Sequence, residues 1–276
     1  MEEWRLLDTE YNSGYYNMAV DEAIMKASRK KLVPPTIRFY QWSPPALSLG
    51  YSQKGKEVVD RKSCARSGVD VVRRLTGGRT ILHDDELTYS IVLREEKDIL
   101  PDSIIKSYKV ISRGMVKGLK KLNLPVELKP FDKNKKKEKG FSAACFDAPS
   151  WYEVLADGKK LIGSAQTRRK GIILQHNYIP FTIKADKIYS LLKMKGNNQE
   201  KLRKRMIDKF QKKATALNTE SEEVININEL KKVLKKGWEE EFQVSLKWGE
   251  LIPQEEKWIK QLVEKKYLTD EWNYRI

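Results

Sequence analysis

The turn Asp157-Gly158 constrains the fold more than any other feature of this sequence, because it separates two stretches rich in strand-forming residues. An Asp-Gly pair adopts the positive φ angles that join two antiparallel strands in the tightest hairpins. We therefore predict a hairpin whose strands lie at 151–156 and 160–168. A third strand is predicted at 171–179, after a second short turn. Three such strands form a meander, which needs other elements to cover it.

The other segments mix strand and helix patterns up to residue 180 and are mainly helical afterwards. Further strands are predicted at 36–42, 46–50, 69–73 and 87–93, and helices at 16–30, 103–121, 185–194, 198–214, 227–240 and 254–266. A mixed or antiparallel sheet with helices packed on it is an α+β fold. We expect a single domain over 1–276, with a sheet-rich core at 1–180 and a mainly helical C-terminal part at 181–276.

The helix predicted at 16–30 is amphipathic. Its apolar face has residues at helical spacing, which are Ala19, Ala23, Ile24 and Ala27. The charged side chains Asp21, Glu22 and Lys26 are assigned to the other face. We therefore expect only the alanine and isoleucine face to pack against the sheet.

Cysteine is rare, with Cys64 and Cys145 in a chain of 276 residues. Two cysteines do not build a disulfide framework at this length, so we expect a reducing compartment, the cytoplasm. Residues 1–8 do not have the pattern of a secretory signal. No run approaches the ~20 apolar residues that cross a bilayer.

The formal net charge of +16 favours an anionic partner, which can be nucleic acid, an anionic membrane or an acidic protein. A solvated lysine face explains the charge equally well at this stage. The lysine-rich runs at 133–139 and 201–205 lack the interleaved aromatic residues of a single-strand-binding surface. The sequence has neither a zinc-finger spacing nor an RNA-binding signature.

A glycine loop at 73–79, Arg-Arg-Leu-Thr-Gly-Gly-Arg, follows a predicted strand and precedes His83. Paired glycines allow the backbone to approach a ligand closely, and flanking arginines suit a phosphate or carboxylate. The bare pattern is also that of an ordinary tight turn. It is not a phosphate-binding P-loop, because the Gly-Lys-Ser/Thr ending is absent.

Cys145 lies among small residues, after a basic loop and before a predicted strand. Nearby cations and exposed backbone N–H groups favour a thiolate, so Cys145 is a candidate nucleophile, and a buried structural thiol is the alternative. Cys64, which lies in a predicted helix, is assigned that ordinary buried role. Lys160 begins the second strand of the hairpin and can polarise a carbonyl oxygen if it points inward. Because side chains alternate along a strand, only one of Lys159 and Lys160 can do so.

His83 and His176 are the histidines of the chain. Neither has a second histidine or a cysteine at the spacing of a metal ligand, so we predict no metal site. A catalytic dyad of Cys145 with either histidine stays open at this point.

Three segments, taken in order, resemble the lipoate-protein ligase and octanoyltransferase superfamily, which shares its fold with biotin protein ligases. They are the loop at 73–79 with His83, the segment 145–153, and the strand at 160–168 with its continuation to His176. The likeness extends to 37–40 and 270–273 and so spans nearly the whole chain. It is closest to the octanoyl-[acyl-carrier-protein]:protein N-octanoyltransferases of the Gram-positive type. One departure is Thr80, where the family has a smaller residue.

The resemblance implies a biotin/lipoate protein ligase-like fold and acyl transfer through a thioester on Cys145. Octanoyl is taken from octanoyl-acyl carrier protein and passed to a lysine in the lipoyl domain of the glycine cleavage H protein. Lys160 is implied to stabilise the acyl carbonyl oxygen and the Cys145 thiolate. The substrate-binding positions that the resemblance implies are Arg74, Thr76, Gly77, Gly78, Arg79, His83, Gly163, Ser164 and Ala165.

The resemblance also implies a single catalytic domain that acts as a cytoplasmic monomer without cofactor, metal or ATP. Because both protein partners of the family are acidic, it favours an acidic protein over nucleic acid or a membrane as the reason for the positive charge. Three alternatives stay open. They are an ATP-dependent lipoate-protein ligase, an amidotransferase that moves octanoyl from the H protein to dehydrogenase subunits, and a non-catalytic binding module in which Cys145 is buried.

Overall fold

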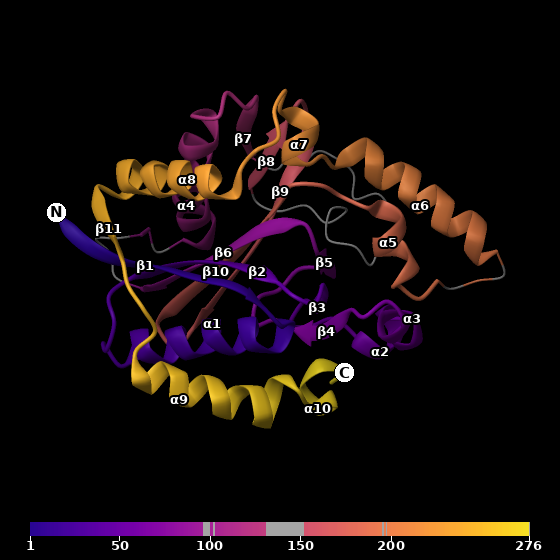
Figure 1. Cartoon of the computed structure of the whole chain (residues 1–276), viewed down its shortest axis with the longest axis horizontal. Helices are drawn as coiled ribbons and strands as arrows, with labels where there is room; N and C mark the ends of the chain where they lie inside the picture. Colours follow the sequence, from indigo (N-terminus) through magenta and orange to yellow (C-terminus); the bar gives the residue numbers. More distant parts are fainter. Residues whose placement is uncertain (96–99, 102, 131–151, 195, 197, 276) are drawn as a thin grey trace.

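The computed structural model describes residues 1–275 except 96–99, 102, 131–151, 195 and 197. These residues form a large mixed sheet with helices on both faces and a small three-stranded sheet beside it (Figure 1). The predicted α+β class is therefore confirmed, and the sheet is mixed rather than purely antiparallel.

The strand order of the large sheet is β11-β1-β2-β6-β10-β9-β8-β7. In that order the strands are β11 (Val244–Trp248), β1 (Glu2–Asn12), β2 (Thr36–Trp42), β6 (Glu86–Arg94), β10 (Ile172–Pro180), β9 (Lys159–Arg169), β8 (Tyr152–Ala156) and β7 (Val126–Pro130). The first three run parallel, and all other neighbours are antiparallel. The small sheet has the order β4 (Asp70–Arg73), β3 (Ala46–Leu49) and β5 (Ile81–His83).

The predicted hairpin is confirmed. Asp157 and Gly158 have φ angles of 45° and 73°, the two positive values that a tight turn between β8 and β9 requires. A second pair with positive φ, Lys170 and Gly171, joins β9 to β10. The meander is therefore built by local turn chemistry, and Trp151 of the predicted hairpin lies outside the described residues.

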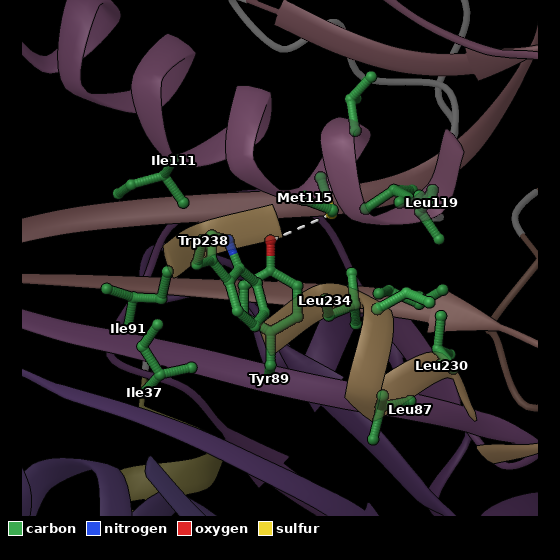
Figure 2. Close-up of a cluster of buried hydrophobic side chains, with 14 of the residues drawn as sticks. Ile37, Leu87, Tyr89, Ile91, Ile111, Met115, Leu119, Leu230, Leu234 and Trp238 are labelled. Carbon is green, nitrogen blue, oxygen red and sulfur yellow. Dashed lines mark hydrogen bonds between the residues drawn. The ribbon is translucent and has the colours of Figure 1, made fainter. Parts of the chain in front are cut away.

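Helices cover both faces of the large sheet (Figure 1). One face is covered by α4 (Ile104–Lys120) and α8 (Ile227–Phe242), and the other by α1 (Gly14–Arg29), against which α9 (Pro253–Leu262) packs. Figure 2 shows the apolar core beneath the first pair, where Met115 and Trp238 meet Tyr89. A Cβ on Gly237 would lie 2.2 Å from the carbonyl oxygen of Gly114, so α4 and α8 approach to backbone contact.

The remaining helical elements are short, apart from α6, and lie mainly near the small sheet. They are α2 (Gly55–Val58), α3 (Arg61–Arg66), α5 (Ala185–Ser190), α6 (Gln199–Lys213), α7 (Leu217–Glu220), the π-helical η2 (Val263–Tyr267) and α10 (Asp270–Asn273). The helices predicted near 198–214 and 227–240 are confirmed. None of the helices described here has both the length and the apolar character needed to span a membrane.

Strands β1, β5, β7 and β11 are absent from the sequence prediction. β11 lies in the part expected to be mainly helical, and its residue Val244 pairs in parallel with Glu2 at the edge of the large sheet. The alternation pattern is weak in these strands, because β5 has only three residues and β1, β7 and β11 carry exposed charged residues near an end. The assignment of 1–276 to one domain stays a prediction, although β11 ties the C-terminal part to the N-terminal strand.

The polar face predicted for the first helix is wrong at one position. The four apolar residues of α1 are fully buried as expected, but Asp21 is buried as well, with 1% of its surface exposed. Its carboxylate accepts hydrogen bonds from Arg38, Tyr40, Ser90 and His176. These partners lie on three different strands, and they replace the water that a carboxylate otherwise needs.

Candidate active site

A narrow cavity lies where α1, the small sheet and the strands β2, β6, β9 and β10 converge. Its wall consists of Met18, Tyr40, Trp42, Ser48, Arg74, Ile81, His83, Thr88, Gly163, Ser164, Ala165, His176, Asn177 and Tyr178. The cavity volume is about 20 Å³, which is room for a water molecule. An eight-carbon chain therefore enters only if wall side chains move.

Five of the predicted substrate-binding residues are part of this wall. They are Arg74, His83, Gly163, Ser164 and Ala165. The other four, Thr76, Gly77, Gly78 and Arg79, lie in the loop between β4 and β5, and Thr76 is hydrogen-bonded to the wall residue His176. The fold therefore brings the glycine loop and the lysine strand together, as the resemblance implied, while the binding role of each residue stays a prediction.

The glycine loop is shaped by Gly78 and Gly50. Gly78 has a φ of +90°, a conformation that other residues rarely adopt, and a Cβ on Gly50 would lie 2.0 Å from the carbonyl oxygen of Gly78. Arg74 closes the loop by donating hydrogen bonds from Nη2 to the carbonyl oxygens of Gly77 and Arg79, at 2.8 and 2.7 Å. Arg74 therefore folds the loop that it flanks.

Arg73 anchors the end of the chain beneath this loop. Its guanidinium group is buried and donates hydrogen bonds to the backbone carbonyl oxygens of Gly50, Tyr51, Gln53, Trp272, Asn273 and Arg275. Burial, with the cations Arg275 and Arg74 nearby, lowers the pKa of Arg73 to about 10. Arg73 and Arg74 thus both donate to carbonyl oxygens of the protein itself, and anion binding by the arginines of the loop stays a prediction.

His83 is held in one orientation by three groups. Its Nδ1 lies 2.7 Å from a carboxylate oxygen of Glu86, its Nε2 lies 2.8 Å from the hydroxyl of Ser48, and its ring stacks on Trp42 with a centroid distance of 4.0 Å. A neutral ring satisfies all contacts when Nδ1 donates to Glu86 and Nε2 accepts from Ser48. Arg74 donates to the same Ser48 hydroxyl, so loop and histidine are linked.

His176 is also held by a hydrogen bond at each ring nitrogen. Its Nε2 lies 2.8 Å from Asp21, and its Nδ1 lies 3.1 Å from the hydroxyl of Thr76. Burial by itself would raise the pKa of Asp21, but the Arg38 guanidinium and the hydrogen bonds from His176 and Ser90 lower it to about 2. Asp21 is therefore a fixed negative charge that orients His176 and, through it, the glycine loop.

These contacts bear on the possible dyad of Cys145 with a histidine. Every ring nitrogen of His83 and His176 already has a hydrogen-bond partner among the described side chains. A dyad would require one of these bonds to be replaced, which disfavours a histidine as the base for Cys145. Cys145 itself lies outside the described residues.

Lys160 is the buried one of the two hairpin lysines, which agrees with the prediction that only one of them can point inward. It is 5% exposed, and its Nζ lies 3.2 Å from the carboxylate of Glu153 on β8. Gly163, the first cavity residue on β9, follows three residues later, which is about 10 Å along a strand. A single strand therefore carries both the buried cation and one wall of the cavity.

The family described as "Lipoyl protein ligase A/B catalytic domain" matches residues 13–239, which include the glycine loop, Lys160 and the cavity wall. The chain belongs to this family. The lipoyl protein ligase A/B fold therefore explains why the glycine loop and the lysine strand converge.

Curated relatives show which type of enzyme within the lipoyl protein ligase A/B family the chain resembles. The chain is 42% identical over 278 residues to the octanoyltransferase LipM of Brevibacillus brevis, with 100% of both chains covered. It is 40% identical to the octanoyltransferase LipM of Bacillus subtilis, with 99% of each covered. These relatives confirm the predicted octanoyltransferase type and, with it, the prediction of an acyltransferase.

Solved structures confirm the predicted fold. The bipartite lipoate protein ligase of Thermoplasma acidophilum superposes with a TM-score of 0.81 at 25% identity, covering 99% of this chain and 97% of that one. Lipoate-protein ligase A bound with ATP superposes with a TM-score of 0.78 at 24% identity, with 99% of both covered. The second likeness concerns the fold alone.

Cys64 has the structural role that the sequence indicated. It lies in α3 and is 2% exposed, and burial, with Asp60 nearby, raises the pKa of its thiol to about 11. It is a poor nucleophile at neutral pH for this reason. Among the described residues, His, Cys, Asp and Glu side chains form no group of three that could hold a metal ion.

Sequence reasoning missed the supporting residues of the site. Asp21, Ser48, Gly50 and Glu86 each hold a predicted residue in place. Asp21 lies 155 residues from His176, Ser48 lies 26 from Arg74 and Gly50 lies 28 from Gly78, whereas Glu86 lies three residues after His83 but outside the motif. The signal for Asp21 was its spacing of three or four residues from the apolar residues Met18, Ile24 and Met25, which places it on their helix face. Gly50 could have been found because it ends a predicted strand and has no adjacent Gly, Pro, Asn or Asp with which to form a turn.

Proposed function

We propose that this enzyme takes an octanoyl group from octanoyl-acyl carrier protein onto Cys145 and transfers it to a lysine of a lipoyl domain, as in the glycine cleavage H protein. The observation that carries the proposal is the continuity of β9, which joins buried Lys160 to the cavity residues Gly163–Ala165. The full-length likeness to octanoyltransferases supports the choice of acyl group.

The first half-reaction loads the enzyme. The Cys145 thiolate attacks the thioester carbonyl carbon, and the carbon–sulfur bond to phosphopantetheine breaks, so that the arm leaves as a thiol after taking up a proton. Negative charge develops on the carbonyl oxygen during the attack, and a lysine ammonium at that position stabilises it. Lys160 is suited to this role because its side chain is buried and its Nζ lies 3.2 Å from the carboxylate of Glu153.

The second half-reaction releases the product. A neutral lysine amine of the lipoyl domain attacks the acyl thioester, the bond to Cys145 breaks, and the amine proton is lost as the amide forms. Conversion of a thioester to an amide is favourable, so the two half-reactions together need no ATP. Apolar burial of the chain at about 0.8 kcal/mol per methylene supports binding once the side chains of the cavity have moved.

The decisive experiment is the intact mass of the protein after incubation with octanoyl-acyl carrier protein without ATP, with Cys145→Ser in parallel. We expect the wild type to gain one octanoyl group that hydroxylamine removes, and the variant to gain none or one that resists hydroxylamine. Addition of H protein then moves the mass from the enzyme to the acceptor.

Two other outcomes identify the rivals. A wild type that stays unmodified by the acyl carrier donor but accepts octanoyl from octanoyl-H protein is an amidotransferase. One that acts only on free octanoate or lipoate with ATP is a ligase. We further infer that the enzyme is cytoplasmic and that its partners are proteins. We also infer that it is a monomer, which size-exclusion chromatography with light scattering tests.

A further inference from the structure

Helix α6 has the largest net positive charge of the described helices after residue 180. It carries seven basic side chains and two acidic ones, a net charge of +5 over fifteen residues. In Figure 1 it is the orange helix at the edge of the molecule, apart from the pairs that cover the large sheet. Its charge therefore lies where a partner can approach.

The cations of α6 are sorted by helical periodicity. Four of them share one face, which we name the α6 basic face, and all four are exposed: Lys201, Lys204, Arg205 and Lys212. The opposite face packs inward through Phe210, which is 2% exposed. The acidic side chain on the basic face is Asp208, so the face remains strongly positive.

Other helices are charged differently. α8 has four basic and four acidic residues and is therefore neutral. α4 also has a net charge of +5, but Arg113 and Lys117 of α4 both contact the carboxylate of Glu241 on α8, at 2.6 and 2.8 Å. Two of the five cations of α4 thus serve the packing of α4 on α8, whereas the α6 basic face points to solvent.

The α6 basic face is joined directly to the lysine strand. The backbone N–H of Thr215, two residues after the helix ends, donates a 3.0 Å hydrogen bond to the carbonyl oxygen of Lys160. Lys212 and Lys159 line the same open hollow on the surface. From there the face extends about 16 Å outward to Lys201, at 1.5 Å per residue.

We propose that the α6 basic face docks the acidic carrier protein that delivers the acyl group, and not the lipoyl-domain acceptor. This inference rests on the function proposed above. A phosphopantetheine arm is several times longer than a lysine side chain, so its carrier can sit along a surface that extends away from Lys160. The acceptor lysine is short and requires its domain to sit directly at the site.

The test uses Lys201→Gln, Lys204→Gln, Arg205→Gln and Lys212→Gln combined in the full-length enzyme. The control removes four exposed lysines of α8 and α9, through Lys232→Gln, Lys236→Gln, Lys257→Gln and Lys260→Gln. Both variants lose the same charge. The rate of acyl-enzyme formation is measured with octanoyl-acyl carrier protein and with the N-acetylcysteamine thioester of octanoate, which has no protein part.

We expect the α6 variant to lose roughly 10- to 100-fold in kcat/KM with the carrier donor and to keep the wild-type rate with the small thioester. The control keeps both rates. With the wild type, the rate with the carrier donor falls as salt rises, while the rate with the small thioester stays level.

Three results would overturn the inference. One is an α6 variant that loads from the carrier as fast as wild type, and another is a wild-type carrier rate that does not respond to salt. The third is a defect confined to transfer from preloaded enzyme to the lipoyl domain, which would assign the face to the acceptor. Failure of the proposed function is distinct from these, because the wild type then acquires octanoyl from neither donor.

Discussion

The two faces of the large sheet are built from the same strands but use opposite chemistry. On β2 and β6, Ile37, Phe39, Tyr89 and Ile91 point toward α4 and α8 and form part of the apolar core (Figure 2). Their neighbours Arg38, Tyr40, Thr88 and Ser90 are equally buried but point toward α1, where hydrogen bonds link them to Asp21, Trp42 or Glu86.

The difference separates stabilisation from positioning. Burial of apolar surface on the α4 side stabilises the fold without regard to direction. On the α1 side, a buried ion pair such as Asp21–Arg38 adds little net stability, yet it fixes His176 and the glycine loop in one arrangement. Changes on the first face should therefore alter stability, and changes on the second should alter stability and catalysis together.

The largest effect is expected from Asp21→Asn. The substitution leaves Arg38 as a buried cation without its carboxylate and removes the acceptor that orients His176. We expect a loss of about 3–5 kcal/mol in the free energy of unfolding and a fall in acyl-enzyme formation per folded molecule. Denaturant titration and intact mass measure the two quantities. Glu256→Gln, at an exposed carboxylate, is the control, and equal stability of both variants would contradict the polar-face assignment.

The α4 side can be tested with Gly237→Ala. The added Cβ collides with the carbonyl oxygen of Gly114, so α4 and α8 must separate, at a cost of about 1–3 kcal/mol. Loading of the remaining folded enzyme should equal that of wild type, because none of the described residues that line the cavity lies on α4 or α8. Lys236→Ala, one residue earlier and exposed, should be neutral. Loss of loading activity in the folded fraction would show that the faces are not separate.

The pH dependence of stability distinguishes the faces without a change in packing. The pKa of Asp21 is lowered from 3.8 to about 2, so its contribution is fully present above pH 3.8. It is lost as pH falls toward 2, and it amounts to about 2 kcal/mol. Denaturant titrations between pH 5 and about 2 should therefore show a decline in the wild type that Asp21→Asn lacks. Parallel curves for the two proteins would exclude Asp21 as the source.

The smallest expected effect compares two adjacent hydroxyls on β6. Ser90 donates to the carboxylate of Asp21 at 2.7 Å, whereas Tyr89 on the opposite face donates to the sulfur of Met115 at 3.1 Å. Ser90→Ala should cost about 1–2 kcal/mol, because the bond is to a charged group, and Tyr89→Phe less than about 1 kcal/mol, because sulfur is a weak acceptor. Thermal denaturation of both variants measures the order, and a reversed order would break the comparison.

Local patterns were sufficient where the determining interactions are short in range. The Asp157-Gly158 turn, the burial of only one of Lys159 and Lys160, and the helix around Cys64 were all predictable for this reason. The edge strand β11 was not, because its pairing partner β1 lies more than 240 residues away in sequence.

The sequence by itself determined the meander, the helix positions and the order of the motifs, since turn preferences and hydrophobic periodicity act over a few residues. Only the tertiary structure decided that Asp21 faces the sheet, that Gly50 meets Gly78, and that both histidines are held by hydrogen bonds. Each of these arrangements depends on groups from distant strands that satisfy a buried polar or strained position together. No window along the chain contains all the partners, so the site emerges from the fold.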